Sequence, residues 1–307
     1  VLWEKTNPAD ELNRIDLSLR CLLLDDGENR VLDTPLSENG FIGAAVGSSL
    51  VGMRPIVETL TSFMWVAMDQ IISQAAKMKY MFGGQASLPV TIRAVMSYGG
   101  GSAAHHSDRS YPMFMNMPGL KIIAPASPED VKGLMKTSVR DNDPCIIFED
   151  SNLAGIKGDV PENNDLNEGE LLIPFGKGKI LREGSDCTVV GIAGANTHAL
   201  NAATELEKEG ISVEIIDPRT LVPLDKEIIL NSVEITGRLV VVDPAHKVCS
   251  AASEIISVVT EEGFWNLQAP PVKIAAEQVH IPFTPALEPL IFPDAEKIIN
   301  AVKQTIE

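Results

Sequence analysis

Two short stretches of the chain carry the side chains best suited to proton transfer. Glu38 stands directly before a small, apolar, glycine-punctuated run, GFIGAAVG, at which a helix is expected to begin. A carboxyl group that is partly buried there can share a proton with a bound base. An acid in the first turn of a helix also stabilises the helix by itself, and the residue types alone favour this capping role.

The second stretch is a histidine pair in a loop of small residues. His105 and His106 lie in GGGSAAHHSD, directly after an expected strand. Glycines let a backbone approach a ligand closely, and sites of α/β proteins lie beyond the carboxyl ends of parallel strands. Because imidazole titrates near neutral pH, either histidine could transfer a proton; the alternative is a solvated loop histidine. His198, His246 and His280 have no partner pattern and are expected to be structural or at the surface.

Composition narrows the class of protein. The 307 residues are 45% hydrophobic, which is enough for two cores of ordinary size. No apolar run approaches the ~20 residues of a membrane helix, and the start, VLWEKTNPADELNRID, is too polar for a secretory signal. A net charge of -17 argues against nucleic-acid binding and is expected to serve solubility.

The cysteines indicate the compartment. They are far apart and include no C-x-x-C pair, which favours buried or inert thiols over a disulfide framework or a zinc site. This usage fits a reducing compartment, either the cytoplasm or an organelle matrix, and not secretion. The four residues are Cys21, Cys145, Cys187 and Cys249.

The first half of the chain alternates between helical and strand-like patterns. The first helix is small and apolar all round, so we expect it to be buried on most sides. Gly83-Gly84 is expected to close the second helix, and Ser127 to cap the third. Continuous apolar runs predict strands that are covered on both faces. The predicted helices are 41–52, 64–82 and 128–140, and the predicted strands are 55–60, 88–95, 120–126 and 145–150.

A polar connection rich in Gly, Asn and acids, residues 151–186, separates this block from a second one. Strands spaced by helices of this length imply βαβ units with a parallel sheet in each half. The predicted fold is therefore two tandem three-layer α/β domains with mainly parallel sheets, residues 1–175 and 176–307. In the second block we predict strands within 187–194, 212–225 and 238–246, and helices at 196–210, 251–263 and 294–307.

Several motifs then point to a family. The stretch RVLDTPLSENGFIGAAVGSSLVGMRPIVE (30–58) resembles the start of the pyrimidine-binding domain in beta subunits of pyruvate and related 2-oxoacid dehydrogenases, which use thiamin diphosphate. GISVEIIDPRTLVPLD and TGRLVVVD resemble the C-terminal domain of the same family. This many motifs in order, from residue 30 to 307, are specific. The similarity continues through DQ (69–70), QAAK (74–77), YMFGGQ (80–85), HS (106–107), PGLK (118–121), KGL (132–134) and RDNDP (140–144).

The resemblance gives each half of the chain a domain type. It implies a transketolase-like, pyrimidine-binding domain at 1–175 and a transketolase C-terminal-like domain at 176–307. The chain before Asp-Thr-Pro is atypically short for the family, and CLLLDDG (21–27) is the part that matches it there.

The resemblance also assigns roles to individual residues. The family's glutamate after Asp-Thr-Pro contacts the ring nitrogen N1′ of the cofactor's aminopyrimidine, and here that residue is Glu38. Phe63 matches a side chain that stacks on the same ring, and Leu60 one that flanks it; a core aromatic is the alternative for Phe63. The family's His-Ser, in the channel that the lipoyl group enters, matches His106, so proton transfer or charge stabilisation is implied for this histidine.

A turn near the end of the third helix matches a metal site of some relatives. Ser138, Val139, Asp141 and Asp143 correspond to a turn that holds a structural potassium ion through carbonyl and carboxylate oxygens. A plain helix C-cap is the alternative, at even weight.

A partner is implied by a missing motif. Proteins that bind the diphosphate carry Gly-Asp-Gly and a later Asn for Mg²⁺, and neither Asp25-Asp26-Gly27 nor Gly158-Asp159-Val160 fits that pattern. The resemblance therefore implies an alpha subunit that holds Mg²⁺ and the diphosphate in an α2β2 heterotetramer. A lipoyl-bearing dihydrolipoyl acyltransferase is the second implied partner, whereas nucleic acid and membranes are not expected.

The implied function is the beta half of a pyruvate dehydrogenase (acetyl-transferring). It would take part in oxidative decarboxylation of a 2-oxoacid, with pyruvate preferred, and in reductive acylation of a lipoyl group. An acetoin- or branched-chain-type dehydrogenase beta subunit is an alternative. The C-terminal subunit of a split transketolase is a second alternative, although DTPLSE disfavours it, and a non-catalytic scaffold is a third.

Overall fold

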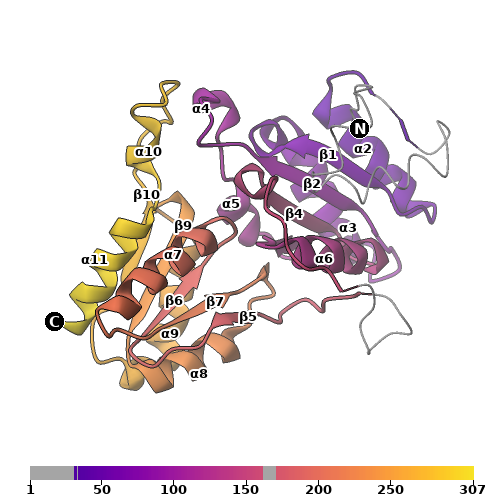
Figure 1. Ribbon diagram of the computed structural model, residues 1–307. Helices are drawn as coiled ribbons and strands as arrows, with labels where there is room; N and C mark the ends of the chain where they lie inside the picture. The colour runs from indigo at the N-terminus through magenta and orange to yellow at the C-terminus, as the bar shows by residue number, and fades with distance from the viewer. Residues whose placement is uncertain (1–30, 33, 162–170) are drawn as a thin grey trace. The chain divides into compact units, whose positions relative to one another are not determined.

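The computed structural model describes residues 31–32, 34–161 and 171–307, which fall into two compact units (Figure 1). Unit 1 holds the described residues up to Ser97 together with Asn116–Pro174. Unit 2 holds Tyr98–Met115 and Phe175–Glu307. Each unit is an α/β layer structure built on its own mainly parallel sheet, as the alternating sequence pattern predicts.

The sheet of unit 1 consists of parallel strands in the order β1-β2-β4-β3. Ile92 of β2 faces Val57 of β1 on one side and Ile146 of β4 on the other. All residues of β4 are buried, as expected of a central parallel strand covered on both faces. The strands are β1 (Ile56–Leu60), β2 (Thr91–Met96), β3 (Lys121–Ile123) and β4 (Cys145–Asp150).

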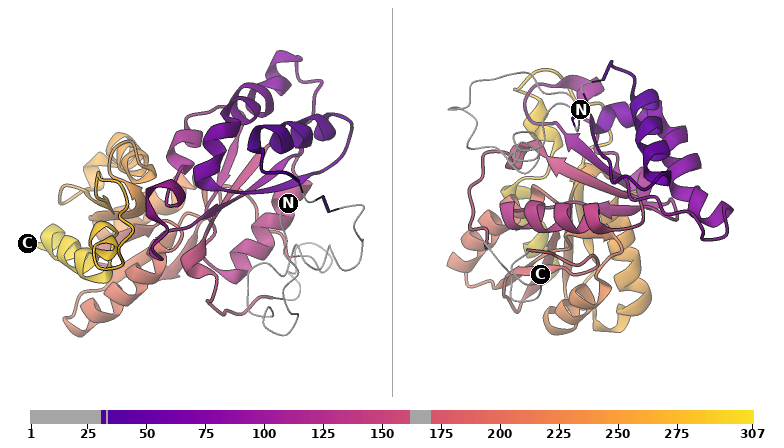
Figure 2. Two further views of the ribbon diagram at one scale, coloured as in Figure 1. Left: turned by 90° about the horizontal axis from the view of Figure 1, so that it is seen from above. Right: turned by 90° about the vertical axis from the view of Figure 1, so that its right-hand side faces the viewer.

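Helices cover both faces of this sheet. Figure 2 shows the helical segments between residues 38 and 81 on one face and α6 on the other. The hydroxyl of Ser127 accepts the backbone N–H of Asp130 at 3.2 Å, so α6 begins at the predicted cap. The helices are α2 (Glu38–Leu50), η1 (Thr61–Ala67), η2 (Asp69–Ala75), α3 (Ala76–Met81) and α6 (Pro128–Arg140), and the short turn η3 (Ser151–Leu153) follows β4.

The helix predicted over 64–82 is wound in three different ways. The η1 segment is a 3-10 helix and η2 is a π-helix, each of seven residues, and only α3 is an α-helix. Because each segment is about two turns long, the spacing of apolar residues does not separate these helix types. The predicted stop is correct: Gly83 and Gly84 have positive φ, and their N–H groups bond the carbonyls of Tyr80 and Lys79 at 3.0 and 2.8 Å.

The first helix, α2, is less enclosed than its sequence predicts. Its buried residues, Ile42, Ala45, Val46 and Ser49, follow a helical spacing and define one face. Residues at and beyond its end stay open, with Val51 77% exposed. The prediction of burial on most sides was wrong for this chain by itself, because α2 has one packing surface, made by β1, η1 and η2.

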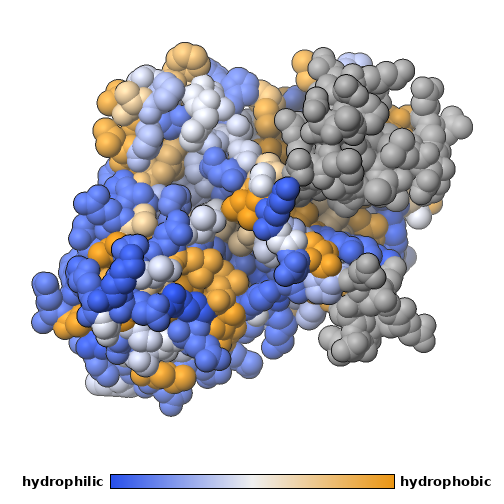
Figure 3. All heavy atoms as spheres, viewed as in Figure 1, coloured by the Kyte–Doolittle hydropathy of each residue, from blue (hydrophilic) through white to orange (hydrophobic). Residues whose placement is uncertain are grey.

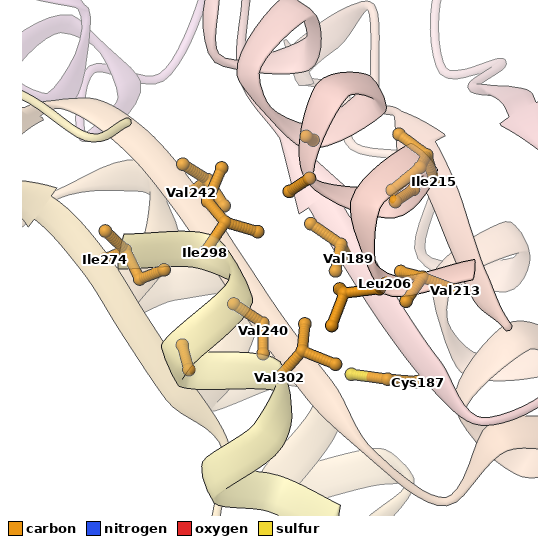
Figure 4. Packing of buried hydrophobic residues seen from close by; sticks show 14 of the residues in the cluster. Cys187, Val189, Leu206, Val213, Ile215, Val240, Val242, Ile274, Ile298 and Val302 are labelled. Carbon is orange, nitrogen blue, oxygen red and sulfur yellow. The ribbon is translucent and has the colours of Figure 1, made fainter. Parts of the chain in front are cut away.

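The sheet of unit 2 has the order β10-β9-β6-β7-β5, and all neighbours are parallel except β5, which runs antiparallel to β7. Helices α7 and α11 pack on one face, and α8 and α9 on the other. Figure 4 shows the first of these cores, where Leu206 of α7 and Val302 of α11 lie against Val189 and Val240 of the sheet.

Unit 2 contains elements that the sequence did not predict, namely α8, β5, β10 and the short helices. The strands are β5 (Lys179–Arg182), β6 (Cys187–Gly191), β7 (Val213–Asp217), β8 (Thr220–Val222), β9 (Leu239–His246) and β10 (Val272–Ala276). The helices are α4 (Ala103–His106), α5 (Tyr111–Met115), α7 (Ala195–Lys208), α8 (Lys226–Thr236), α9 (Ala251–Glu262), η4 (Phe264–Asn266), α10 (Glu288–Ile291) and α11 (Ala295–Ile306).

One segment departs from a simple division of the chain near residue 175. Residues 98–115 directly follow β2 of unit 1 in sequence but belong to unit 2. The physical reason is a set of polar and aromatic contacts, described below, that tie this segment to β9 and α10. The domain limits 1–175 and 176–307 therefore stay a prediction, and they do not describe the segment that carries the histidine pair.

Within the part of the chain that the structure describes, no helix is both long and apolar enough to cross a membrane.

The glycine of the Pro118-Gly119 motif allows a close packing that can be tested. Gly119 has a φ of +97°, and a Cβ added there would lie 2.1 Å from the carbonyl oxygen of Ala76 in α3. Gly84 has a similar φ of +80° but nothing within 4 Å of such an atom. We expect Gly84→Ala to cost about 1–2 kcal/mol for the left-handed backbone. Gly119→Ala should cost distinctly more, because strain and overlap add.

Urea unfolding of the full chain measures this difference, with Gly84→Ala as the matched control. Equal losses of stability in the two variants would contradict the close contact between Gly119 and α3.

Candidate active site

Glu38 is the first residue of α2, and its carboxyl group is available for a ligand. Ser37 occupies the N-cap position but makes no side-chain capping bond. Glu38 is partly buried, and it makes no hydrogen bond or ion pair with the described part of the chain. A capping role would consume this carboxylate on the helix's own N–H groups, so the geometry leaves it free to contact a bound group.

The topology places Glu38 toward the edge where α/β sites form. Arg54, between α2 and β1, bonds to the turn that precedes β4, so the carboxyl end of α2 lies at the amino edge of the sheet. The thirteen residues of α2 span about 20 Å along β1. Glu38 therefore lies toward the opposite, carboxyl edge, where β1 ends at Leu60.

Leu60 and Phe63 lie at this same edge. Leu60 is the last residue of β1, and Phe63 lies in η1, the turn that follows it. Both side chains are partly buried, and both elements pack against α2. Unit 1 thus brings Glu38, Leu60 and Phe63 to neighbouring elements at one edge of its sheet, which is the set of residues that a planar ring would need for contact on its rim and face.

The histidine pair lies in unit 2, on the single-turn helix α4. His105 and His106 are both exposed. The loop before them is tightly turned, since Gly99, Gly101 and Ala103 all have positive φ. Positive φ is costly for a residue with a side chain such as Ala103, and surrounding contacts must hold it in place.

Glu288, a residue that the sequence analysis did not single out, supplies such contacts. Its carboxylate is 1% exposed and accepts the backbone N–H groups of Gly99 and Gly101 at 2.6 and 2.8 Å. The ring of Phe292, on the same C-terminal segment, lies 4.7 Å from the ring of Tyr98. The guanidinium of Arg109 lies over both rings, 4.7 Å from Phe292 and 5.3 Å from Tyr98.

A second buried contact holds the far end of the loop. The hydroxyl of Tyr111 donates to the carboxylate of Asp243 in β9, which also accepts the N–H groups of Ala245 at 2.8 Å and Ala252 at 3.0 Å. Burial, together with the charge of Asp243, raises the pKa of Tyr111 well above its ordinary value, so the hydroxyl keeps its proton and remains a donor. Burial also raises the pKa of Asp243, although these hydrogen bonds oppose it.

Arg109 is buried with unused donors. Its Nη1 donates to the carbonyl of Ser107, while Nε and Nη2 have no partner among the described residues. The hydroxyls of Ser107 and Ser110 are also buried without a partner there. Burial lowers the pKa of the guanidinium, and the neighbouring tyrosines and acids oppose that effect. Ser107 belongs to the His-Ser motif, but no motif marked Arg109 or Ser110; an Arg close to two serines after a glycine-rich loop was the available signal.

The remaining histidines and cysteines lie outside this group. His198 and His280 are exposed, and His246 bonds the carbonyl of Glu277 at 2.8 Å through Nδ1. Burial raises the pKa of Cys145 and of Cys187 to about 12, which makes these thiols inert as predicted. Cys249 is exposed, so for this thiol only the inert half of the prediction stays open. Cys21 lies outside the described residues.

Comparisons with known proteins agree with this arrangement. Residues 16–156 match the model of the transketolase pyrimidine binding domain, and residues 176–298 match that of the transketolase C-terminal domain. The beta subunit of acetoin:2,6-dichlorophenolindophenol oxidoreductase from Cupriavidus necator is 46% identical over 91% of this chain and 81% of its own length. The pyruvate dehydrogenase E1 component subunit beta of Rickettsia felis is 42% identical over 92% of this chain and 85% of its own.

The chain belongs to the family of E1-type beta subunits of thiamin-diphosphate-dependent 2-oxoacid dehydrogenases. A solved structure described as a split gene transketolase, inactive beta4 tetramer, shares the fold with a TM-score of 0.75 at 24% identity. That likeness covers 95% of this chain and 90% of the transketolase. The predicted family and the predicted pair of α/β domains are thus confirmed.

The residues of this beta subunit suit one half of the cofactor better than the other. Glu38, Leu60 and Phe63 offer a carboxyl group and apolar surface, which fit an aminopyrimidine ring. Within the described residues, no group of three or more His, Cys, Asp or Glu side chains could hold a metal ion. Asp159 is exposed, and Asp25-Asp26-Gly27 lies outside the described residues.

The predicted potassium turn of the beta subunit is already bonded to a cation of the chain itself. Arg54 Nη1 donates to the carbonyls of Val139 and Asp141 at 2.9 and 2.8 Å, and Nη2 donates to Oδ1 of Asn142 at 2.6 Å. The hydroxyl of Ser138 bonds the carbonyl of Leu134 at 2.8 Å, as a residue inside a helix does. The guanidinium therefore engages two of the carbonyls that the ion would need.

Lysines neutralise the two carboxylates of the same turn. Lys121 bonds the carboxylate of Asp141 at 2.5 Å, and Lys79 pairs with that of Asp143. Burial would raise the pKa of Asp143, but the nearby Lys79 and Lys121 outweigh it and lower the pKa. The turn thus fits a monovalent ion poorly, because internal cations occupy its oxygens, and it lies at the amino edge of the sheet, away from the edge that carries Glu38.

We expect the stability of the full chain to be the same in KCl and in NaCl at equal ionic strength. Arg54→Ala should lower the free energy of unfolding by about 1–2 kcal/mol, because it removes a charged donor from three oxygens at the surface. Potassium should then restore part of the loss in the variant. Thermal unfolding in the two salts measures this, with Arg54→Lys as the variant that keeps the charge without the fork. A potassium-specific stabilisation of the unmutated chain would instead support the predicted ion at this turn.

Proposed function

We propose that this chain is the beta subunit of a pyruvate dehydrogenase E1 component and completes its active site with an alpha subunit. The assembled α2β2 enzyme decarboxylates a 2-oxoacid, with pyruvate preferred, and transfers the acyl group to the lipoyl group of a dihydrolipoyl acyltransferase. The observation that carries the proposal is the free, partly buried carboxyl group of Glu38 at the start of α2, beside β1 and η1. The compartment is a reducing one, such as the cytoplasm or an organelle matrix.

In this proposal the chain supplies the pyrimidine half of the site. Thiamin diphosphate, when bound, provides a carbanion at C2 of its thiazolium ring and an electron sink for decarboxylation. Glu38 would hold a proton at the ring nitrogen N1′ of the bound cofactor. Phe63 would cover a face of the ring and Leu60 its rim, and both would exclude water from the carboxyl group.

His106 acts on the other reactants. An exposed imidazole on a short helix is open to an arriving lipoyl arm, and it can donate a proton to sulfur or stabilise charge on the oxoacid. His105 is equally exposed, so the pair provides two candidates for this role.

A partner is supported by what this chain leaves uncovered. The end of α2 is exposed, and elsewhere unit 1 has an apolar groove of about 760 Å³ whose lining includes Tyr80, 90% exposed, and Met81. Large exposed apolar surfaces of this kind mark protein interfaces. In the proposal the alpha subunit covers such surfaces and holds Mg²⁺ and the diphosphate. Potassium at residues 138–143 stays a prediction, and the bonds of Arg54 argue for the guanidinium in its place.

Acetoin is the second candidate substrate, because the Cupriavidus necator relative is named for acetoin and 46% of its aligned residues are the same. Assays of the assembled enzyme with pyruvate and with acetoin, each with 2,6-dichlorophenolindophenol as electron acceptor, decide between the two. A split transketolase would instead transfer a two-carbon unit between sugar phosphates and would reduce no electron acceptor.

The chain by itself should bind thiamin diphosphate weakly or not at all, even with Mg²⁺, because its described residues gather no set of His, Cys, Asp or Glu ligands for the Mg²⁺ that holds the diphosphate. Titration calorimetry of the isolated chain, and of the chain with its alpha partner, measures this. Tight, magnesium-dependent binding by the isolated chain would refute the shared site.

Glu38→Gln tests the central assignment. The amide keeps the shape of the side chain but cannot share a proton with N1′, so the assembled variant should lose about 10²–10⁴ in rate. Assembly and thermal stability should change little, since the amide fills the same space. A capping role predicts the reverse, namely a stability loss of about 1 kcal/mol with nearly normal turnover.

Exchange of the cofactor's C2 proton, followed by NMR in deuterated water, reports the affected step directly. Wild-type exchange in the assembled Glu38→Gln enzyme would overturn the role of Glu38. Glu296→Gln is the matched control, because Glu296 is an exposed acid in the first turn of α11.

A further inference from the structure

The glycine loop before the histidine pair binds a carboxylate of the protein itself. Gly99 and Gly101 have φ values of +78° and +75°, and both of their N–H groups point to Glu288. Backbone N–H groups brought together by such alternating conformations form a concavity that suits an anion. Each oxygen of Glu288 takes one of these N–H groups, Oε1 at 2.6 Å and Oε2 at 2.8 Å.

The contact is buried, and the loop has little room to move. Glu288 is 1% exposed, so water does not compete for its oxygens. A Cβ added to Gly101 would meet the carbonyl oxygen of Phe283 at 3.3 Å, which shows how closely the C-terminal segment approaches the loop. The side chain of Phe283 itself is 74% exposed. Figure 3 shows hydrophobic groups, in orange, over the segment that carries α10.

The spacing along the chain connects this contact to the histidines. Only Ser102 separates Gly101 from α4, and His106 is the last residue of that helix. Beyond α4, Arg109 lies over the Phe292 ring and Tyr111 bonds Asp243, so the loop is fixed on both sides of the histidine pair. The short helix that carries the exposed imidazole is therefore held in place on both sides.

We propose that Glu288 is a positioning residue for the histidine pair: its carboxylate fixes the glycine loop at Gly99 and Gly101 and so sets the place of His106. The proposal rests on the function proposed above for His106. Glu288 touches neither cofactor nor substrate in this role and acts only through the loop. An acid is needed because a single side chain must accept two N–H groups at once; an amide offers one oxygen and places N–H donors against the second backbone N–H.

Glu288→Gln is the decisive variant, since it keeps shape and volume. In the assembled α2β2 enzyme we expect it to lower acyl transfer to a lipoyl domain by about tenfold, the effect of one lost charged hydrogen bond. Decarboxylation followed with 2,6-dichlorophenolindophenol should fall much less in this variant, and the same contrast is expected for His106→Ala. Glu288→Asp keeps the charge but is shorter by one methylene group, so its rate of acyl transfer should lie between those of the unmutated enzyme and Glu288→Gln. Glu296→Gln should behave as the unmutated enzyme.

Combining the two changes separates positioning from general damage. If Glu288 acts through His106, the double variant His106→Ala with Glu288→Gln should be no slower than the slower single variant. Multiplied losses would overturn the positioning role. Hydrogen exchange of the peptide 98–107 gives a readout without turnover: the amides of Gly99 and Gly101 should exchange faster in Glu288→Gln, and unchanged protection would overturn the anchoring itself.

The two proposals can fail separately. Full acyl transfer by His106→Ala would refute the function of His106, while hydrogen exchange would still decide whether Glu288 holds the loop. Slow acyl transfer by His106→Ala with unchanged rates in Glu288→Gln would refute the positioning role alone.

Discussion

A segment that enters a folded unit must bring its buried polar groups to acceptors, and in residues 98–115 two buried carboxylates accept backbone N–H groups and a tyrosine hydroxyl. Residues 98–115 follow a strand of unit 1 but are built into unit 2. Glu288 accepts N–H groups at the start of the segment, and Asp243 accepts the hydroxyl of Tyr111 near its end. Without such acceptors the glycine conformations would lose their contacts, and with them the placement of α4 and its histidines.

The two edges of the unit 1 sheet are used in different ways. At the amino edge, Arg54, Lys79 and Lys121 satisfy the oxygens of the turn after α6, so that edge is electrostatically closed. Toward the carboxyl edge, Glu38 keeps a carboxyl group without a bond to the described residues, on a helix that packs against the elements of Leu60 and Phe63. An acid without a partner costs stability when it is buried, so a partly buried acid of this kind is typical of a site that a ligand completes.

The same contrast explains why the chain suits a shared active site. Its described residues can surround a ring with carboxyl and apolar groups, but they gather no set of oxygen ligands for a divalent ion. Apolar surface stays exposed on α2 and around Tyr80, where a soluble monomer would bury or replace it. In the proposed enzyme, the alpha subunit would supply the metal ligands and cover this apolar surface.

Sequence reasoning succeeded where one local rule governs the outcome. Ser127 starts α6, Gly83 and Gly84 stop α3, and the run CIIFED forms a strand buried on both faces. It did not separate the 3-10, π and α segments of 61–81, since each segment is only about two turns long and the apolar spacing over so few residues fits more than one helix type. It also overestimated the burial of α2, because small apolar residues pack equally well against this chain or against a partner.

The sequence by itself determined the family, the pair of parallel α/β layers and the candidate Glu38, because periodicity, caps and ordered motifs are local properties of the chain. Only the tertiary structure decided which residues, far away in the sequence, contact the loops and turns of the candidate sites. Glu288 reaches a loop nearly two hundred residues earlier (|i−j| = 187 and 189), and Arg54 reaches a turn more than eighty residues later (|i−j| = 85 to 88). No local pattern encodes such pairs, because the chain must fold before side chains so far apart in the sequence can meet.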